Sequence, residues 1–168
     1  TGNTLNFISL FALILAVVLW DAIHAFVAYD ALMNAEGDVD SLKGAVSSNS
    51  FDAFPVIYAD MKSNTATAAA STSDPIWRAT EGIPVLGPNL ASFRQVSQTI
   101  NQVVVEGIGP LAAKAKGLNL GDFRPKDGQV DMAGIESFIP AIDAANRGLL
   151  DAQKTGNAID TSHDLSPV

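Results

Sequence analysis

Cysteine is absent from the 168 residues of this chain. Its absence excludes disulfide bonds, thiol catalysis and metal sites built from cysteine. Histidine occurs only at His24 and His163, so a serine–histidine–aspartate triad would have to use one of these two residues. Neither lies in a pattern that would hold a catalytic histidine, and we therefore predict that the chain is not an enzyme.

Positive charge is also scarce. Ten Lys and Arg residues stand against 18 Asp and Glu, which gives a formal net charge of −8. Nucleic-acid-binding proteins carry basic faces that neutralise phosphates. Here only Arg124 and Lys126 form a local basic pair, and Asp122 and Asp127 flank them. We expect no nucleic-acid partner.

Sequence motifs for cofactors and metals are missing as well. The segment Gly107-Ile-Gly109-Pro110 lacks the preceding strand and the third glycine of a phosphate-binding loop. A group of carboxylates that could resemble a metal site comprises Asp30, Glu36, Asp38 and Asp40. Its spacing is typical of a solvated helix face and not of a calcium loop. We predict no cofactor, no metal and no small-molecule substrate.

What the chain does have is a long apolar run at its start. Residues 1–20 contain no charged side chain. Twenty helical residues span roughly 30 Å, the thickness of the hydrocarbon core of a membrane. Trp20 and Tyr29 suit the membrane–water interface. We therefore predict a transmembrane anchor over residues 1–29.

Two other interpretations of this run are a cleaved signal peptide and a buried core helix. A cleaved signal peptide requires small residues at its cleavage site after a shorter apolar run. Here the run is followed by Trp20-Asp-Ala-Ile-His-Ala-Phe26, which does not resemble such a site. A core helix of a soluble protein rarely has twenty consecutive uncharged residues. The transmembrane helix explains the pattern better than either.

The charges that follow the run indicate its orientation. The first basic residue is Lys43, and five acidic residues precede it. Cytoplasmic flanks are enriched in Lys and Arg, so a flank without them lies on the far side. We predict a single-pass protein of the plasma membrane, with its N-terminus in the cytoplasm and the rest of the chain extracytoplasmic.

Helical periodicity continues beyond the anchor. The first helix is predicted to run from Leu5 to Val46, with an apolar stripe at Leu32, Ala35, Val39, Leu42 and Val46. A second helix is predicted over Asp52–Ser71, with the stripe Phe54, Ile57, Met61, Thr65 and Ala68. Ser73 or Asp74 is expected to cap a short helix that starts at Pro75.

Two further long helices complete the prediction. One starts at Pro88 and carries the stripe Leu90, Phe93, Ser97, Ile100, Val104, Ile108 and Leu111; Gly107, Gly109 and Pro110 should interrupt it. The other runs from Met132 to Lys154, is capped by Asp131 and bent at Pro140, and should turn Ile135, Phe138, Ile142 and Leu149 inward. A turn is predicted at Asp127-Gly128. The fold class is therefore all-α, an up-and-down bundle of about four helices over residues 30–155, followed by a polar tail over residues 156–168.

Two segments carry a family resemblance. The run Asp74-Pro-Ile-Trp-Arg78, followed by Ile83-Pro-Val-Leu-Gly-Pro-Asn-Leu90, resembles the N-terminal region of actinobacterial envelope proteins that contain the domain of unknown function 4012. Phe123–Asp131 resembles a second landmark of that family. The resemblance covers about Trp20 to Asp164. It implies a membrane anchor and a helical ectodomain in an actinobacterial envelope, and it transfers no functional residue.

Candidate binding residues lie at the membrane and in the connector. Asp21 and His24 share a helix face and suggest a hydrogen-bonded pair at the interface beside Trp20. Ala12 and Ala16 would permit close docking of another helix. Trp77 is either a buried aromatic residue that fixes the connector or an exposed anchor for a partner.

Three functions are compatible with these features. The first is a non-enzymatic accessory or scaffold subunit that docks on a larger membrane protein complex, for instance a respiratory one. The second is the stalk of an actinobacterial envelope-glycan assembly protein, as the resemblance implies. The third is a ligand-sensing ectodomain, but such proteins usually have a second transmembrane helix, and no second apolar run follows Asp30. We expect partners among membrane proteins and in the lipid bilayer.

Overall fold

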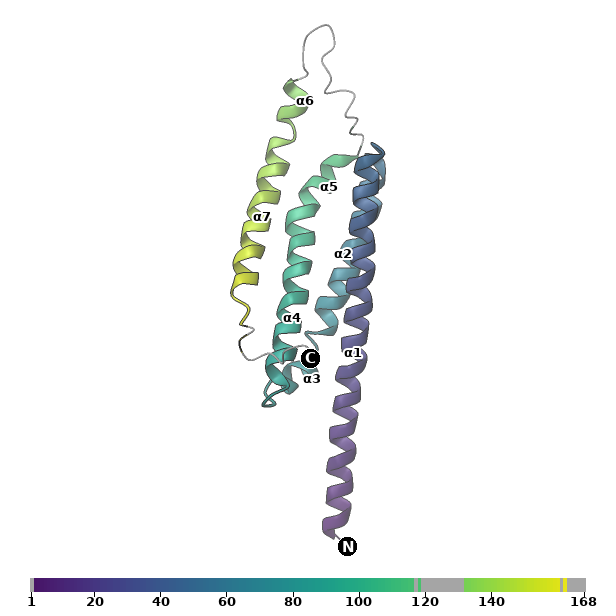
Figure 1. The fold of residues 1–168 in the computed structure, drawn as a ribbon, viewed down its shortest axis with the longest axis vertical. Helices are drawn as coiled ribbons and strands as arrows, with labels where there is room; N and C mark the ends of the chain where they lie inside the picture. The colour runs from purple at the N-terminus through teal and green to yellow at the C-terminus, as the bar shows by residue number, and fades with distance from the viewer. Residues whose placement is uncertain (1, 117, 119–131, 161, 163–168) are drawn as a thin grey trace.

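The computed structural model describes residues 2–116, 118, 132–160 and 162, and within these residues the secondary structure is helical without strands. The first and longest element is α1 (Gly2–Ser47), whose 46 residues extend over about 69 Å. Figure 1 shows that its N-terminal part projects beyond all the other helices. The all-α class predicted from the sequence is confirmed.

Helix α1 buries side chains against the remaining helices in its second half. The buried side chains on α1 are Ala28, Ala31, Ala35 and Ala45. This corrects part of the predicted stripe, because Val39 and Val46 are exposed. The physical reason is that small alanine side chains allow the next helix to approach closely, which leaves the larger residues at the edges of the contact.

Helix α2 (Phe54–Ser71) packs along α1 after the short 3₁₀ helix η1 (Phe51–Ala53). Met61, Thr65 and Ala68 of the predicted stripe are buried. The Nδ2 atom of Asn64 donates a hydrogen bond of 2.9 Å to Oδ2 of Asp38, which links the polar edges of the two helices. The predicted second helix is confirmed.

The connector contains the predicted short helix, α3 (Pro75–Thr80). It leads through Glu81 and residues 82–86, called here the α3–α4 turn, into α4 (Gly87–Gln102). The helix that was predicted to start at Pro88 is interrupted near Gly107 and Gly109, as the sequence indicated. A π-helical segment, η2 (Val103–Ile108), follows α4, and α5 (Gly109–Ala115) follows η2. Thr65 Oγ1 donates to Asn101 Oδ1 at 3.1 Å, which ties α2 to α4.

The last predicted helix consists of two pieces, α6 (Met132–Glu136) and α7 (Ile139–Asn157). Pro140 does not bend one continuous helix. It lies in the first turn of α7, where its missing N–H leaves no hydrogen bond unmade. Figure 1 shows α7 beside the α4–α5 segment, with α6 at the end of the molecule away from the N-terminus.

The inward face of α7 differs from the prediction. Ala141, Ala145, Gly148 and Ala152 are buried, whereas Ile135, Ile142 and Leu149 are exposed. The backbones approach too closely for larger residues: a Cβ atom added at Gly148 would overlap the carbonyl group of Glu106 in η2. Small residues therefore form the contact, and the bulky aliphatic residues are displaced to the outside.

Several predictions fall on residues that the structure does not describe. They are the turn at Asp127-Gly128, the cap at Asp131, the landmark Phe123–Asp131 and most of the tail over residues 156–168. These stay predictions. The tail was predicted to begin at residue 156, while α7 continues to Asn157.

Candidate functional site: the junction between α1 and the α3–α4 turn

A hydrogen bond joins the end of the apolar run to the connector. The indole Nε1 of Trp20 donates to Oδ1 of Asp74 over 3.0 Å. The same carboxylate oxygen caps α3 by accepting from the backbone N–H groups of Ile76 (2.8 Å) and Trp77 (3.2 Å). One side chain thus satisfies two free N–H groups of the helix start and also fixes α3 against α1.

These donors affect the acidity of Asp74. Partial burial alone would raise the pKa of the carboxyl group. The hydrogen bonds from Trp20, Trp77 and Ile76, with a smaller contribution from His24, outweigh burial and lower the pKa below its ordinary value. Asp74 is therefore held as a carboxylate, the form that accepts all three hydrogen bonds.

His24 belongs to this junction through Trp20. Its ring stacks on the Trp20 indole with 4.6 Å between centroids, and its Nδ1 atom lies 3.0 Å from the Trp20 carbonyl oxygen. The predicted pairing of His24 with Asp21 is wrong. Oδ1 of Asp21 is buried and has no hydrogen-bond partner among the described residues.

Trp77 is buried completely. Its Nε1 atom donates to the carbonyl oxygen of Leu90 over 3.1 Å, and its ring lies 6.0 Å from that of Phe93. The sequence allowed Trp77 to be either a buried residue that fixes the connector or an exposed anchor for a partner. The structure agrees with the buried residue. Trp77 offers no exposed surface to a partner.

The charged groups beside the connector are paired. Arg94 donates from Nε and Nη2 to the two carboxylate oxygens of Glu81, and the Nη2 contact is 3.1 Å long. Both side chains are mostly buried. Arg78 adds a contact of 3.7 Å from its Nε atom to Glu81. From Gly82 to Phe93 the chain contains no charged residue, so the α3–α4 turn is an uncharged tip.

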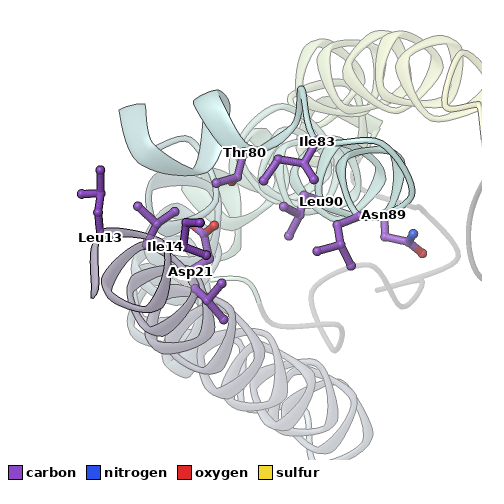
Figure 2. A pocket seen from close by; sticks show the side chains of 10 residues that line it. Leu13, Ile14, Asp21, Thr80, Ile83, Asn89 and Leu90 are labelled. Atoms are coloured by element: carbon purple, nitrogen blue, oxygen red, sulfur yellow. The ribbon is translucent and has the colours of Figure 1, made fainter. Parts of the chain in front are cut away.

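A groove of about 350 Å³ lies between this tip and α1. One wall is formed by α1 and the other by the end of α3, the turn and the start of α4 (Figure 2). The lining is apolar except at a few positions, of which Asp21 alone is ionisable. The groove is lined by Leu13, Ile14, Val17, Val18, Asp21, Thr80, Ile83, Leu86, Asn89 and Leu90.

Ala12 and Ala16 do not face this groove. With about 3.6 residues per turn, they lie on the side of α1 opposite to Ile14, Val17 and Asp21. Both alanines are exposed. The structure therefore separates the predicted binding residues into two groups, with Trp20, Asp21 and His24 at the junction and Ala12 and Ala16 on the free side of α1.

A second apolar surface lies on α6 and α7. Six large aliphatic side chains are exposed there, and a hollow of about 230 Å³ opens among some of them. We call this set the α6–α7 face; it consists of Met132, Ile135, Ile139, Ile142, Leu149 and Leu150. The sequence did not reveal this face, because Ile135, Ile142 and Leu149 were predicted to point inward.

The described residues contain no group of three or more His, Asp or Glu side chains that could hold a metal ion. Among them, α1 is the helix that is long and apolar enough to cross a membrane, a test that a signal sequence near the N-terminus also passes. Comparisons with protein-family models, curated proteins and solved structures found no match. The resemblance to proteins with the domain of unknown function 4012 stays a prediction from the motifs.

Proposed function

We propose that this chain is a non-enzymatic, single-pass membrane subunit whose extracytoplasmic helical bundle docks on a larger membrane protein complex. The bundle of about four helices comprises the second half of α1, α2, α4 with α5, and α7. The observation that carries the proposal is that α7 buries small residues and exposes large apolar ones, which we call its inverted packing. Its buried residues are alanines and a glycine, while Ile139, Ile142 and Leu150 are exposed and Leu149 lies at the edge of the contact beside Gly107 of η2.

This inversion favours a protein partner. Six exposed aliphatic side chains on adjoining elements form an apolar surface of the kind that marks interaction sites. With the N-terminal part of α1 in the membrane, α6 lies at the end of the molecule farthest from the lipid (Figure 1). Lipid therefore does not cover that end, and another protein is the fitting occupant.

The free side of α1 supports the same function. Ala12 and Ala16 are one turn apart and exposed, a spacing that lets a second transmembrane helix approach closely. The groove and the α3–α4 turn occupy the other side of α1. A partner helix would thus find one unobstructed, small-residue surface on which to pack.

The test is affinity purification of this chain from its native membrane after extraction with a mild detergent, with mass spectrometry of the proteins that accompany it. We expect a membrane complex in fixed stoichiometry. Leu150→Glu on the α6–α7 face and Ala16→Phe on α1 should each remove it. Val56→Glu, at an exposed apolar residue of α2, is the matched control and should retain it.

Two results would contradict the proposal. One is recovery of the chain alone, or as part of a longer envelope polypeptide, which would favour the stalk function. The other is a complex that all three variants retain equally, because the partner would then contact neither proposed surface.

A further inference from the structure

We propose that the groove between α1 and the α3–α4 turn binds one acyl chain of a membrane glycerophospholipid whose ammonium headgroup is held by Asp21. This inference rests on the membrane anchor of the proposed function but requires no partner complex. Four features of the junction carry it: the depth of the groove, the exposed apolar tip, the size of the space and the unpaired carboxylate oxygen.

The depth of the groove places it within one leaflet. Its α1 wall extends from Leu13 to Asp21, a rise of about 12 Å along the helix. Trp20 at the end of this wall marks the interface, and half of a hydrocarbon core is about 15 Å thick. The groove therefore lies within the outer leaflet, where lipid acyl chains surround the protein.

The tip of the α3–α4 turn is built for the same surroundings. Ile83, Val85 and Leu86 are exposed, and no charged residue occurs from Gly82 to Phe93. Val85 has φ = 75°, a conformation that ordinarily carries glycine or asparagine. Its side chain is 64% exposed. An exposed valine at the tip of the turn suits contact with lipid.

The size of the space suits a lipid chain. The groove offers about 350 Å³ beside the α1 wall. A single flexible acyl chain can occupy this narrow apolar space.

Asp21 indicates the chemistry of the headgroup. It is the last α1 residue of the groove, so it lies at the end farthest from the N-terminus. Its Oδ1 atom is buried without a hydrogen-bond partner among the described residues, which is an unfavourable position for a carboxylate oxygen. An ammonium group donates hydrogen bonds and carries the opposite charge, so phosphatidylethanolamine is the matching headgroup.

The experiment uses the purified full chain in vesicles of phosphatidylethanolamine and phosphatidylglycerol. A small fraction of the phosphatidylethanolamine carries a photoreactive diazirine in its acyl chain, and the labelled residues are mapped by mass spectrometry. We expect labels on Ile83, Leu86 or Leu90 in addition to the open faces of α1. Val17→Phe, which fills the groove, should abolish labelling of the turn, whereas Leu19→Phe, at an exposed residue on the opposite side of α1, should not change it.

A second arm tests the headgroup. Phosphatidylcholine with the same photoreactive chain has no N–H donor. We expect it to label the turn about three- to fivefold less than phosphatidylethanolamine, the effect of one partly exposed ion pair. Asp21→Asn should remove this preference. Equal labelling by both probes in the unmodified chain would overturn the role of Asp21.

The possible failures are distinguishable. Labels on the free side of α1 but none on the turn would overturn the acyl-chain site and leave the membrane anchor intact. No label anywhere on α1 would instead contradict the anchor itself. Should Val17→Phe disturb folding, as a changed helical circular dichroism spectrum would reveal, Leu90→Phe fills the groove from the other wall and must give the same loss.

Discussion

The indole of Trp20 donates a hydrogen bond to the carboxylate of Asp74 over 3.0 Å, across 54 positions in the sequence. This contact joins the end of the apolar run of α1 to the start of α3. Because Asp74 also caps α3, one side chain holds both the end of the apolar run and the start of the connector helix. The junction therefore joins the apolar part of α1 to the other helices.

Removing the Asp74 side chain should destabilise this junction. Asp74→Ala deletes the cap and the acceptor for Trp20, and we expect a lower melting temperature in detergent micelles. Asp74→Asn is the control, because asparagine also caps helices and keeps one acceptor oxygen. Thermal unfolding followed by circular dichroism should rank unmodified chain, Asn and Ala in descending order. Equal melting of the Ala and Asn variants would contradict the capping role.

Acid should loosen the same contact. The pKa of Asp74 is lowered in the folded chain, so the stability that its charge contributes is fully present above about pH 4, the ordinary range of an aspartate. That stability is lost as the pH falls further, through the lowered pKa. The indole N–H resonance of Trp20 should shift in this acidic window, while that of buried Trp77 should not follow it. A Trp20 resonance that does not move below about pH 4 would contradict the assignment.

The close contact between α7 and η2 predicts an unusual response to alanine. Gly148→Ala should destabilise the chain by about 1–3 kcal/mol, because the new Cβ atom overlaps Glu106. This outweighs the gain of up to about 1 kcal/mol that alanine brings to a helix. Gly37→Ala in α1 has open space and should stabilise by about 0.5–1 kcal/mol. Chemical denaturation gives both values, and equal signs for the two variants would contradict the packing.

Relief of backbone strain should be measurable at Val85. Its φ of 75° is unfavourable for a β-branched residue. In detergent micelles we expect Val85→Gly to raise the free energy of unfolding by about 1 kcal/mol. A loss of stability of that size would mean that the valine side chain packs against the protein and not against lipid.

Much of this fold was predictable from the sequence because local signals agreed with tertiary packing. The cap at Asp74, the start at Pro75, the stripe of α2 and the break near Gly107 each depend on residues within a few positions of one another. Which face of α7 is buried could not be predicted in this way. An apolar stripe and an alanine stripe both have helical periodicity, and only the distance to η2, set by Gly148 and Glu106, decides which one is buried.

The candidate site was predictable only in part. Trp20, Asp21 and His24 were selected because ionisable and aromatic residues stood at the end of an apolar run. Their partners were not evident, since the bond from Trp20 to Asp74 and the groove against Leu86 and Leu90 join distant segments. The pairing of Asp21 with His24 failed because helical spacing permits a contact without requiring one, and the His24 ring lies against Trp20 instead.

The central claim is that α1 crosses the membrane and holds the helical domain outside. The absence of native cysteine allows a direct test with single cysteines at Asn3, Leu13 and Ser47 in intact cells and a membrane-impermeant maleimide. We predict that Ser47→Cys is labelled from outside, that Asn3→Cys is labelled only after the membrane is opened, and that Leu13→Cys is protected throughout. Labelling of Asn3 and Ser47 from the same side, or a mature chain that has lost the apolar run, would contradict the claim.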